Sequence, residues 1–208
     1  MSSISVTTEP IARPELANLS LLLSKAFSSP VDFKPSHPQS CGEMAAGLPP
    51  SLQRSGTALA EEWEHALLDR DAVLRAYARL FVGPFEIQAP PYASHYLEPD
   101  RRLMGDVSMW VAEAYAESGL DPAEGPREAP DHVALEWEYL YYLGYQSITL
   151  QFPDSCIRAQ SFIDEHMIKW IPHFAEAILA SDTHPYYHAL ARFAPPFVRF
   201  LGTKTSQK

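Results

Sequence analysis

The segment EAPDHVALEWEYLYYL, residues 128–143, carries the clearest secondary-structure signal of the chain. Its apolar residues recur at three- and four-residue steps instead of alternating with polar ones, which indicates a helix. Pro130 suits a first helical turn, and Asp131 places negative charge near the positive end of the helix dipole. We therefore predict a helix from about Asp131 to Thr149, the most hydrophobic one of the chain.

The same periodicity outside this segment predicts six more helices. They are expected at about 16–27, 51–68, 71–83 (capped by Asp71), 100–118 (stopped by Gly119), 155–179 (kinked at Pro172) and 183–200. The segment from Pro30 to Pro50 is expected to be a long loop, and Pro90-Pro91 an extended passage.

Three prolines and one glycine in residues 121–130 favour a hinge between two halves. Strand pairs, repeats and Asn-Gly hairpin signals are not found in the sequence. The expected fold is all-α: a single-domain helical bundle, residues 1–208, of about seven helices.

The composition is that of an ordinary globular protein and excludes general disorder. The 208 residues are 46% hydrophobic and 12% aromatic, with 19 prolines against 9 glycines. The formal net charge of −10 disfavours nucleic acid and anionic lipid and favours a basic partner. Cys41 and Cys156 are far apart and are expected to be reduced thiols. The apolar run Leu16–Phe27 is interrupted by polar residues and is expected to be an amphipathic helix of a cytoplasmic protein, with no membrane insertion.

The sequence offers few candidate catalytic or metal-binding groups, and none forms a complete site. His184 and His188 are four residues apart, but no glutamate lies between them as a metalloprotease helix requires. His132 and Glu136 have the same spacing, which favours a hydrogen bond on a helix surface. His166 and His173 are expected on one helix face beside Trp170, as packing residues. The chain is therefore predicted to be no enzyme and to need no metal or cofactor.

Two segments are more unusual than these histidines. The first is YARLFVGPF at 77–85, continued by APPYASHY at 89–96, where a helix end feeds a stiff turn rich in aromatic residues. Such rings either seal a core or line a groove, and core packing is the favoured interpretation. The second is the pair Asp131-His132 at the start of the apolar helix. Helix capping accounts for Asp131, but not for a polar pair at that place.

These segments resemble the TorD/DmsD-type family of redox-enzyme maturation chaperones. The resemblance lies in YxxLFxGP…PPYxSxY, in EAPDHVALExEYxYYL, and in the stretch FIDEHMIKW at 162–170, which is similar to the family's F-x-x-E-H-L-x-x-W. The three matches follow in the same order over residues 77–170. Tyr77 stands where the family often has tryptophan, and Ala129 where it often has proline, so the leader preference of this chain is open.

The resemblance implies an all-α chaperone that binds the twin-arginine signal peptide of a molybdopterin-dependent oxidoreductase. The chaperone would assist cofactor insertion and hold back premature export. The leader-binding positions that it implies are Tyr77, Leu80, Phe81, Pro91, Tyr92, Asp131 and His132. On this reading Asp131 accepts hydrogen bonds from a leader arginine, while Leu80 and Phe81 pack its apolar part.

Two other functions stay open beside the chaperone. One is a guanine-nucleotide-binding regulatory module, although the sequence shows no phosphate loop. The other is a small metal-dependent hydrolase. The client enzyme is not named by the sequence, and the protein is expected to be a monomer or a domain-swapped dimer.

Overall fold

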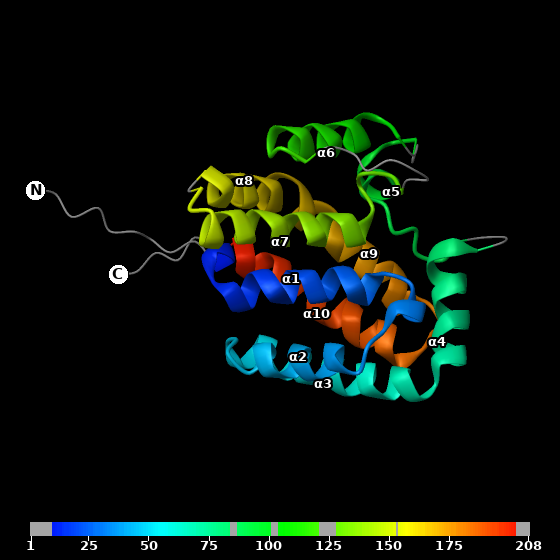
Figure 1. Cartoon of the computed structure of the whole chain (residues 1–208). Coiled ribbons are helices and arrows are strands. Elements are labelled where there is room, and N and C mark those ends of the chain that lie inside the picture. The colour runs from blue at the N-terminus through cyan, green and yellow to red at the C-terminus, as the bar shows by residue number, and fades with distance from the viewer. Residues whose placement is uncertain (1–9, 84–86, 101–103, 121–127, 153, 203–208) are drawn as a thin grey trace, which may run out of the picture.

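The computed structural model describes residues 10–83, 87–100, 104–120, 128–152 and 154–202. The regular elements within these ranges are helices (Figure 1). The α-helices are α1 (Pro14–Phe27), α2 (Ser36–Ala45), α3 (Pro50–Leu68), α4 (Arg70–Tyr77), α5 (Ala93–Leu97), α6 (Asp106–Glu117), α7 (Val133–Thr149), α8 (Asp154–Phe162), α9 (Ile168–Ala180) and α10 (Pro185–Gly202). Two 3-10 turns, η1 (Pro10–Ala12) and η2 (Pro30–Asp32), and two π-helical turns, η3 (Ala78–Val82) and η4 (Ile163–Met167), complete the set.

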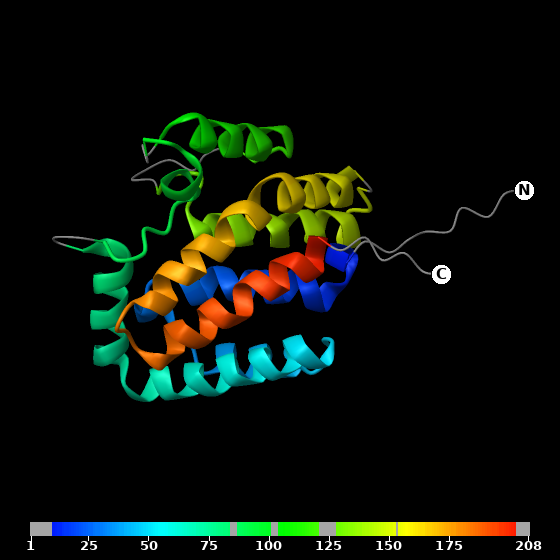
Figure 2. The same cartoon turned by 180° about the vertical axis from the view of Figure 1, so that it is seen from behind.

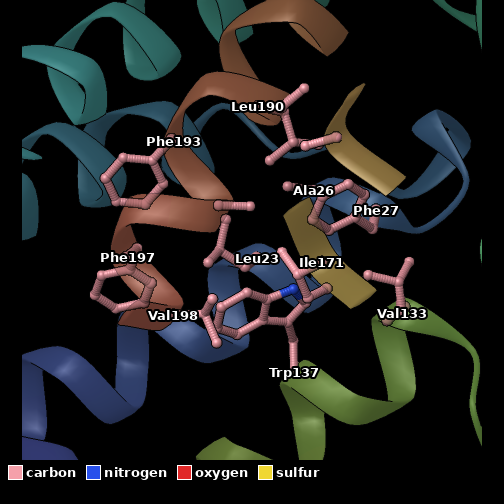
Figure 3. Packing of buried hydrophobic residues seen from close by; sticks show 14 of the residues in the cluster. Leu23, Ala26, Phe27, Val133, Trp137, Ile171, Leu190, Phe193, Phe197 and Val198 are labelled. Atoms are coloured by element: carbon pink, nitrogen blue, oxygen red, sulfur yellow. The ribbon is translucent and has the colours of Figure 1, made fainter. Parts of the chain in front are cut away.

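The helices are arranged in layers around the pair α1 and α10. Helices α2 and α3 lie on one side of this pair, α7 and α8 lie on the other, and α6 lies beyond α7 and α8 (Figures 1 and 2). The core between them is aromatic: Trp137 of α7 stacks on Phe197 of α10, and both rings are fully buried (Figure 3). Burial of such rings removes large apolar areas from water and is the main force that holds these layers together.

Two glycines allow neighbouring helices to approach closely. A Cβ atom on Gly144 of α7 would lie 2.7 Å from the Cβ of Ala17 on α1. A Cβ atom on Gly56 of α3 would lie 2.5 Å from the Cβ of Ala45 on α2. Both contacts are shorter than side chains tolerate, so larger residues at these positions would force the helices apart.

The all-α expectation is confirmed, but the expected loop from Pro30 to Pro50 is wrong. It contains η2 and the ten-residue helix α2, whose Cys41 and Ala45 are buried. Pro38 is tolerated because it lies in the first turn of α2, where backbone N–H groups have no intrahelical acceptor. The burial of α2 against α3 outweighs its proline-rich composition.

Other boundaries also differ from expectation. The carboxylate of Asp69, not of Asp71, caps α4 by accepting a hydrogen bond from the Ala72 amide at 3.3 Å. The passage after Pro90-Pro91 includes the short helix α5, and the helix expected from Asp100 begins at Asp106.

Gly119 has a φ of +81°, as suits a residue that ends a helix. The segment expected as one helix from about 155 to 179 is α8, η4 and α9, with Pro172 inside α9.

Most of the expected hinge lies outside the described residues, which resume at Glu128. Within the described ranges, no helix combines the length and the apolar character that a membrane span requires.

Candidate functional site

The two unusual segments of the sequence lie side by side in the structure. Tyr92 and His132 form an isolated antiparallel β-bridge. Its hydrogen bonds run from the Val133 amide to the Pro91 carbonyl at 2.9 Å and from the Ala93 amide to the Asp131 carbonyl at 3.0 Å. The rigid turn that follows η3 is thereby attached to the start of the most hydrophobic helix, α7.

A group of polar and aromatic side chains, from exposed to buried, surrounds this bridge. We call Tyr77, Tyr92, Glu128 and His132 the bridge cluster. The Tyr92 hydroxyl donates to Oε1 of the exposed Glu128 at 2.6 Å, and the Tyr92 ring meets the His132 ring edge-on with centroids 5.3 Å apart. Burial, together with the negative charge of Glu128, raises the pKa of Tyr77. The cluster is therefore a neutral aromatic surface with one carboxylate at its edge.

His132 is the N-cap of α7. Its Nδ1 accepts a hydrogen bond from the Ala134 amide at 3.2 Å. Burial lowers the pKa of His132, although the nearby Glu128 and Asp131 act in the opposite direction. The imidazole is thus neutral near pH 7, with its proton on Nε2, and it offers one N–H donor.

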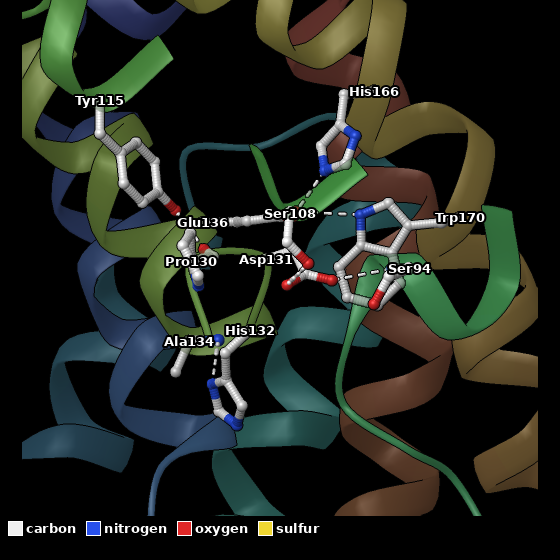
Figure 4. A network of polar contacts seen from close by, with 10 residues as sticks. All are labelled: Ser94, Ser108, Tyr115, Pro130, Asp131, His132, Ala134, Glu136, His166 and Trp170. Carbon is white, nitrogen blue, oxygen red and sulfur yellow. Dashed lines mark hydrogen bonds and ion pairs between the residues drawn. The ribbon is translucent and has the colours of Figure 1, made fainter. Parts of the chain in front are cut away.

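Asp131 is fully buried and connects three helices. Its Oδ2 accepts from the Ser94 amide of α5 at 2.8 Å, and its Oδ1 accepts from the Ser108 hydroxyl of α6 at 2.7 Å (Figure 4). The carboxylate thus fastens α5 and α6 to the start of α7, and His132, not Asp131, caps that helix. A leader arginine would reach this carboxylate only if Ser94 and Ser108 released it.

A second buried carboxylate, Glu136, lies one turn into α7. Its Oε1 is 2.5 Å from Nε2 of His166, and its Oε2 accepts from the Trp170 indole N–H at 2.9 Å (Figure 4). Burial raises the pKa of Glu136, more strongly than the His166 and Trp170 contacts lower it. The expected surface hydrogen bond between His132 and Glu136 is wrong, because Glu136 points inward and His132 is occupied by the cap.

His166 and His173 also have different environments. His166 lies in η4, is buried, and its ring centroid is 5.2 Å from that of Trp110. His173 is exposed and lies 3.5 Å from Glu176. A π-helical turn changes the residue spacing, so the seven-residue separation does not place these two rings on a common face.

The sequence-predicted site residues form two layers. Tyr77 and Tyr92 are half-buried at the bridge. The other five, Leu80, Phe81, Pro91, Asp131 and His132, are buried. Phe81 packs against Phe174 and Tyr187, so the expectation of core packing is confirmed for this ring.

Glu128, Ser94 and Ser108 of this site were not selected from the sequence. Glu128 and Ser94 lie inside the two quoted motifs, so their place in these motifs could have identified them as site residues. Ser108 carries no motif, and only its contact with Asp131 reveals it.

His184 and His188 are each committed to the backbone. Nδ1 of His184 accepts from the Tyr186 amide at 3.2 Å, and Nε2 of His188 is 3.0 Å from the Ser181 carbonyl oxygen. The helix α10 begins at Pro185, so His184 precedes it and the two imidazoles do not share a helix face. Among the described residues, no three His, Cys, Asp or Glu side chains are grouped for a metal ion.

Two cavities lie away from the bridge cluster. One, of about 140 Å³, lies between α6, α7 and α8 and is lined by residues that include Trp110, Glu113, Glu117, Tyr139 and Phe162. The other, of about 190 Å³, lies between α3 and α10 and is lined in part by Glu62, His188 and Arg192.

Comparison with known protein families identifies the family of this chain. A family model described as nitrate reductase delta subunit matches residues 43–176, which include all three motifs, the bridge cluster, Asp131 and Glu136. The chain belongs to the nitrate reductase delta subunit family. The matched range omits α1 and α10, which complete the core around the family's segment.

Relatives within and around this family carry chaperone names. Over 156 residues the chain is 29% identical to a protein named chaperone protein TorD from Vibrio cholerae, covering 72% of this chain and 70% of that one. It is 23% identical to a protein named Tat proofreading chaperone DmsD from Salmonella typhi, with 60% of this chain aligned to 57% of that one. The resemblance to the TorD/DmsD-type family is thereby confirmed.

A solved structure shows the same fold. A putative redox enzyme maturation protein from Archaeoglobus fulgidus superposes with a TM-score of 0.57 at 23% identity, over 90% of this chain and 94% of that chain. At this identity the likeness speaks for the fold alone.

Proposed function

We propose that this member of the nitrate reductase delta subunit family is a cytoplasmic chaperone for the precursor of a molybdopterin-dependent oxidoreductase. It binds the precursor through its twin-arginine leader, assists cofactor insertion and delays export. The observation that carries the proposal is the β-bridge between Tyr92 and His132, which joins the two family motifs into one surface. The chaperone names of the TorD and DmsD relatives support the same role.

The bridge cluster suits the apolar part of a leader. Tyr77 and Tyr92 are half-buried rings, and Tyr92 packs edge-on against the buried, neutral His132, which favours contact with an apolar peptide. Leu80, Phe81 and Pro91 are buried, and the Phe81 ring meets the Tyr77 ring edge-on with centroids 5.3 Å apart. The exposed Glu128 and the net charge of −10 attract a basic peptide and accelerate encounter.

We propose a positioning role for Asp131. Both of its oxygens are engaged by α5 and α6, so replacing it changes the site by loosening these helices. We propose that His132, which is 7% exposed, donates its Nε2–H toward a leader carbonyl.

The test is binding of a labelled synthetic peptide that carries two adjacent arginines followed by an apolar stretch. His132→Ala is expected to weaken binding about tenfold, because it removes a donor and an aromatic contact. Tyr92→Phe, which keeps the ring and removes the link to Glu128, is expected to have a smaller effect. Tyr145→Phe is the matched control, because Tyr145 is an exposed tyrosine of the same helix α7 near its other end.

Thermal unfolding of each variant separates binding from folding, since His132 also caps α7. If His132→Ala and Tyr92→Phe unfold at the parent's temperature and bind the peptide as the parent does, the bridge cluster is not the leader site. If the parent itself does not distinguish the peptide from a scrambled one, the leader-binding proposal fails.

A further inference from the structure

The cavity between α6, α7 and α8 combines aromatic walls with carboxylates. Trp110 of α6 stacks on Phe162 of α8, with ring centroids 5.7 Å apart and planes inclined by 12°. Tyr139 of α7 meets Phe162 edge-on at 4.9 Å. Glu113 and Glu117, one turn apart on α6, lie on the same lining. We call this the α6 cavity.

The carboxylate of Glu113 in the α6 cavity is available to a cationic ligand, because the hydroxyl groups of the lining have other hydrogen-bond partners. The Tyr139 hydroxyl donates to the Ala114 carbonyl, and the Ser161 hydroxyl donates to Glu165. Among the described residues, no ion pair engages the exposed Glu113. Carboxylates beside aromatic faces are the surroundings that a planar guanidinium prefers, because it donates hydrogen bonds in its plane and stacks on rings.

The protein's own Arg158 shows the carboxylate part of this recognition. From α8 its guanidinium Nη1 approaches Oε2 of Glu117 at 3.3 Å, on the lining of the cavity. The side chains of Arg158 and Glu117 are 40% and 73% exposed, so the pair is weak and can be exchanged for another cation. The cavity volume of about 140 Å³ is several times the roughly 30 Å³ share of one water molecule, enough for part of a long side chain.

We infer that the α6 cavity is a second subsite, which takes an arginine side chain of the client polypeptide. This inference rests on the proposed function. A single residue connects the two places: Tyr115 donates its hydroxyl to the Pro130 carbonyl at 2.9 Å, beside the bridge cluster, and packs on Tyr139 of the cavity with centroids 4.7 Å apart. One peptide places its apolar stretch on the bridge cluster and a guanidinium in the α6 cavity.

The test compares arginine with citrulline, which has nearly the same shape and no charge. Two labelled synthetic peptides are used, one with twin arginines before an apolar stretch and one with twin citrullines in their place. The parent is expected to prefer the arginine peptide about tenfold, and Glu113→Gln/Glu117→Gln is expected to remove that preference while binding the citrulline peptide as the parent does. Glu61→Gln/Glu62→Gln on α3, which likewise removes two negative charges, here beside the cavity between α3 and α10, is the matched control and is expected to keep the preference.

Arg158→Gln is expected to change the affinity for the arginine peptide in the opposite direction. It removes the internal competitor for Glu117 and is expected to strengthen binding of the arginine peptide about threefold, with no change for the citrulline peptide. A merely structural role of Arg158 would not separate the two peptides.

Failure of this inference can be told from failure of the proposed function. If the double variant keeps the arginine preference, the α6 cavity is not the subsite, although leader binding stands. If the parent binds neither peptide, leader binding fails, and the cavity is judged with N-acetylarginine amide alone. Movement of the Trp110 indole signal in nuclear magnetic resonance with this probe, but not with N-acetylcitrulline amide, supports the subsite, and no movement overturns it.

Discussion

The side of the molecule at α3 and α10 and the side at α6 differ in how far side-chain hydrogen bonds add to the apolar packing. Between α3 and α10, the buried rings of Trp63 and Tyr186 lie 5.7 Å apart, and a Cβ on Gly56 would come within 3.2 Å of the Phe193 ring. Helix α6 is attached by hydrogen bonds, among them Ser108 to Asp131, as well as by ring contacts such as Trp110 on Phe162 and Tyr115 on Tyr139. Close apolar packing has little room to adjust, whereas hydrogen bonds at an exposed helix can be exchanged with water or a ligand.

The α6 cavity lies on the side with more side-chain hydrogen bonds, whereas the cavity of about 190 Å³ lies between α3 and α10. Tyr115, Tyr139 and Tyr142 reach across with their hydroxyls to backbone carbonyls at the α6–α7 contact. Of these three side chains, Tyr139 also lines the α6 cavity.

The largest effect is expected for Trp63→Ala on the packed side. Trp63 is fully buried among Phe33 and Tyr186, so its loss should lower the free energy of unfolding by about 3–5 kcal/mol in urea titration. The matched change Trp110→Ala, at a ring 38% exposed on α6, should cost clearly less. Equal losses for the two tryptophans would contradict the contrast.

Asp131→Asn should have the next largest effect on stability. The amide oxygen can still accept from the Ser94 amide, and the NH₂ group can donate to the Ser108 hydroxyl if that hydroxyl rotates, but hydrogen bonds to a charged group, worth about 1.5–3 kcal/mol each, are replaced by weaker neutral ones. Hydrogen exchange should rise first at amides of α5 and α6. The exposed Glu128→Gln serves as control, and uniform exchange over all helices would argue against a local fastening role.

Glu136 is expected to make the free energy of unfolding depend on pH. Because its pKa is raised in the folded state, that state binds a proton more tightly than the unfolded one, so unfolding becomes easier as the pH rises. The loss begins near the ordinary pKa of a glutamate and ends above the raised value. Glu136→Gln, which can keep contacts with His166 and Trp170, should lack this decline.

The comparison is made by urea titration of both proteins at several pH values. The groups that face Glu136, namely His166, Trp170 and Asp131, are present in both proteins, so the difference curve reports the loss of this carboxyl together with its interaction with His166. A difference that does not change with pH would show that Glu136 is not the titrating group.

The smallest effect is expected for Arg158→Gln. Its pair with Glu117 is exposed, so the free energy of unfolding should change by less than about 1 kcal/mol. A larger loss would mean that this ion pair is needed to hold α6 in place, and would contradict the expectation that the pair is weak. Salt should reduce whatever contribution remains.

Helical periodicity was sufficient for the all-α class and for most long helices, because a helix buries one face and its sequence repeats that face every three to four residues. The ends at Gly83 and Gly119 were also predictable, since both have positive φ. Helix α2 was missed because proline content was read as loop, although prolines in a first turn break no hydrogen bond.

The motif residues were identified from the sequence, but their neighbours were not. The resemblance selected Tyr77, Tyr92, Asp131 and His132, and the bridge shows that their segments meet. Whether a carboxylate faces water or protein is set by helices distant in sequence: Ser94 and Ser108 enclose Asp131, and His166 and Trp170 enclose Glu136. Local sequence determines which face of α7 is apolar. Only the packing of α5, α6, η4 and α9 against it decides that these two acids are buried, because solvation depends on every element that covers a group.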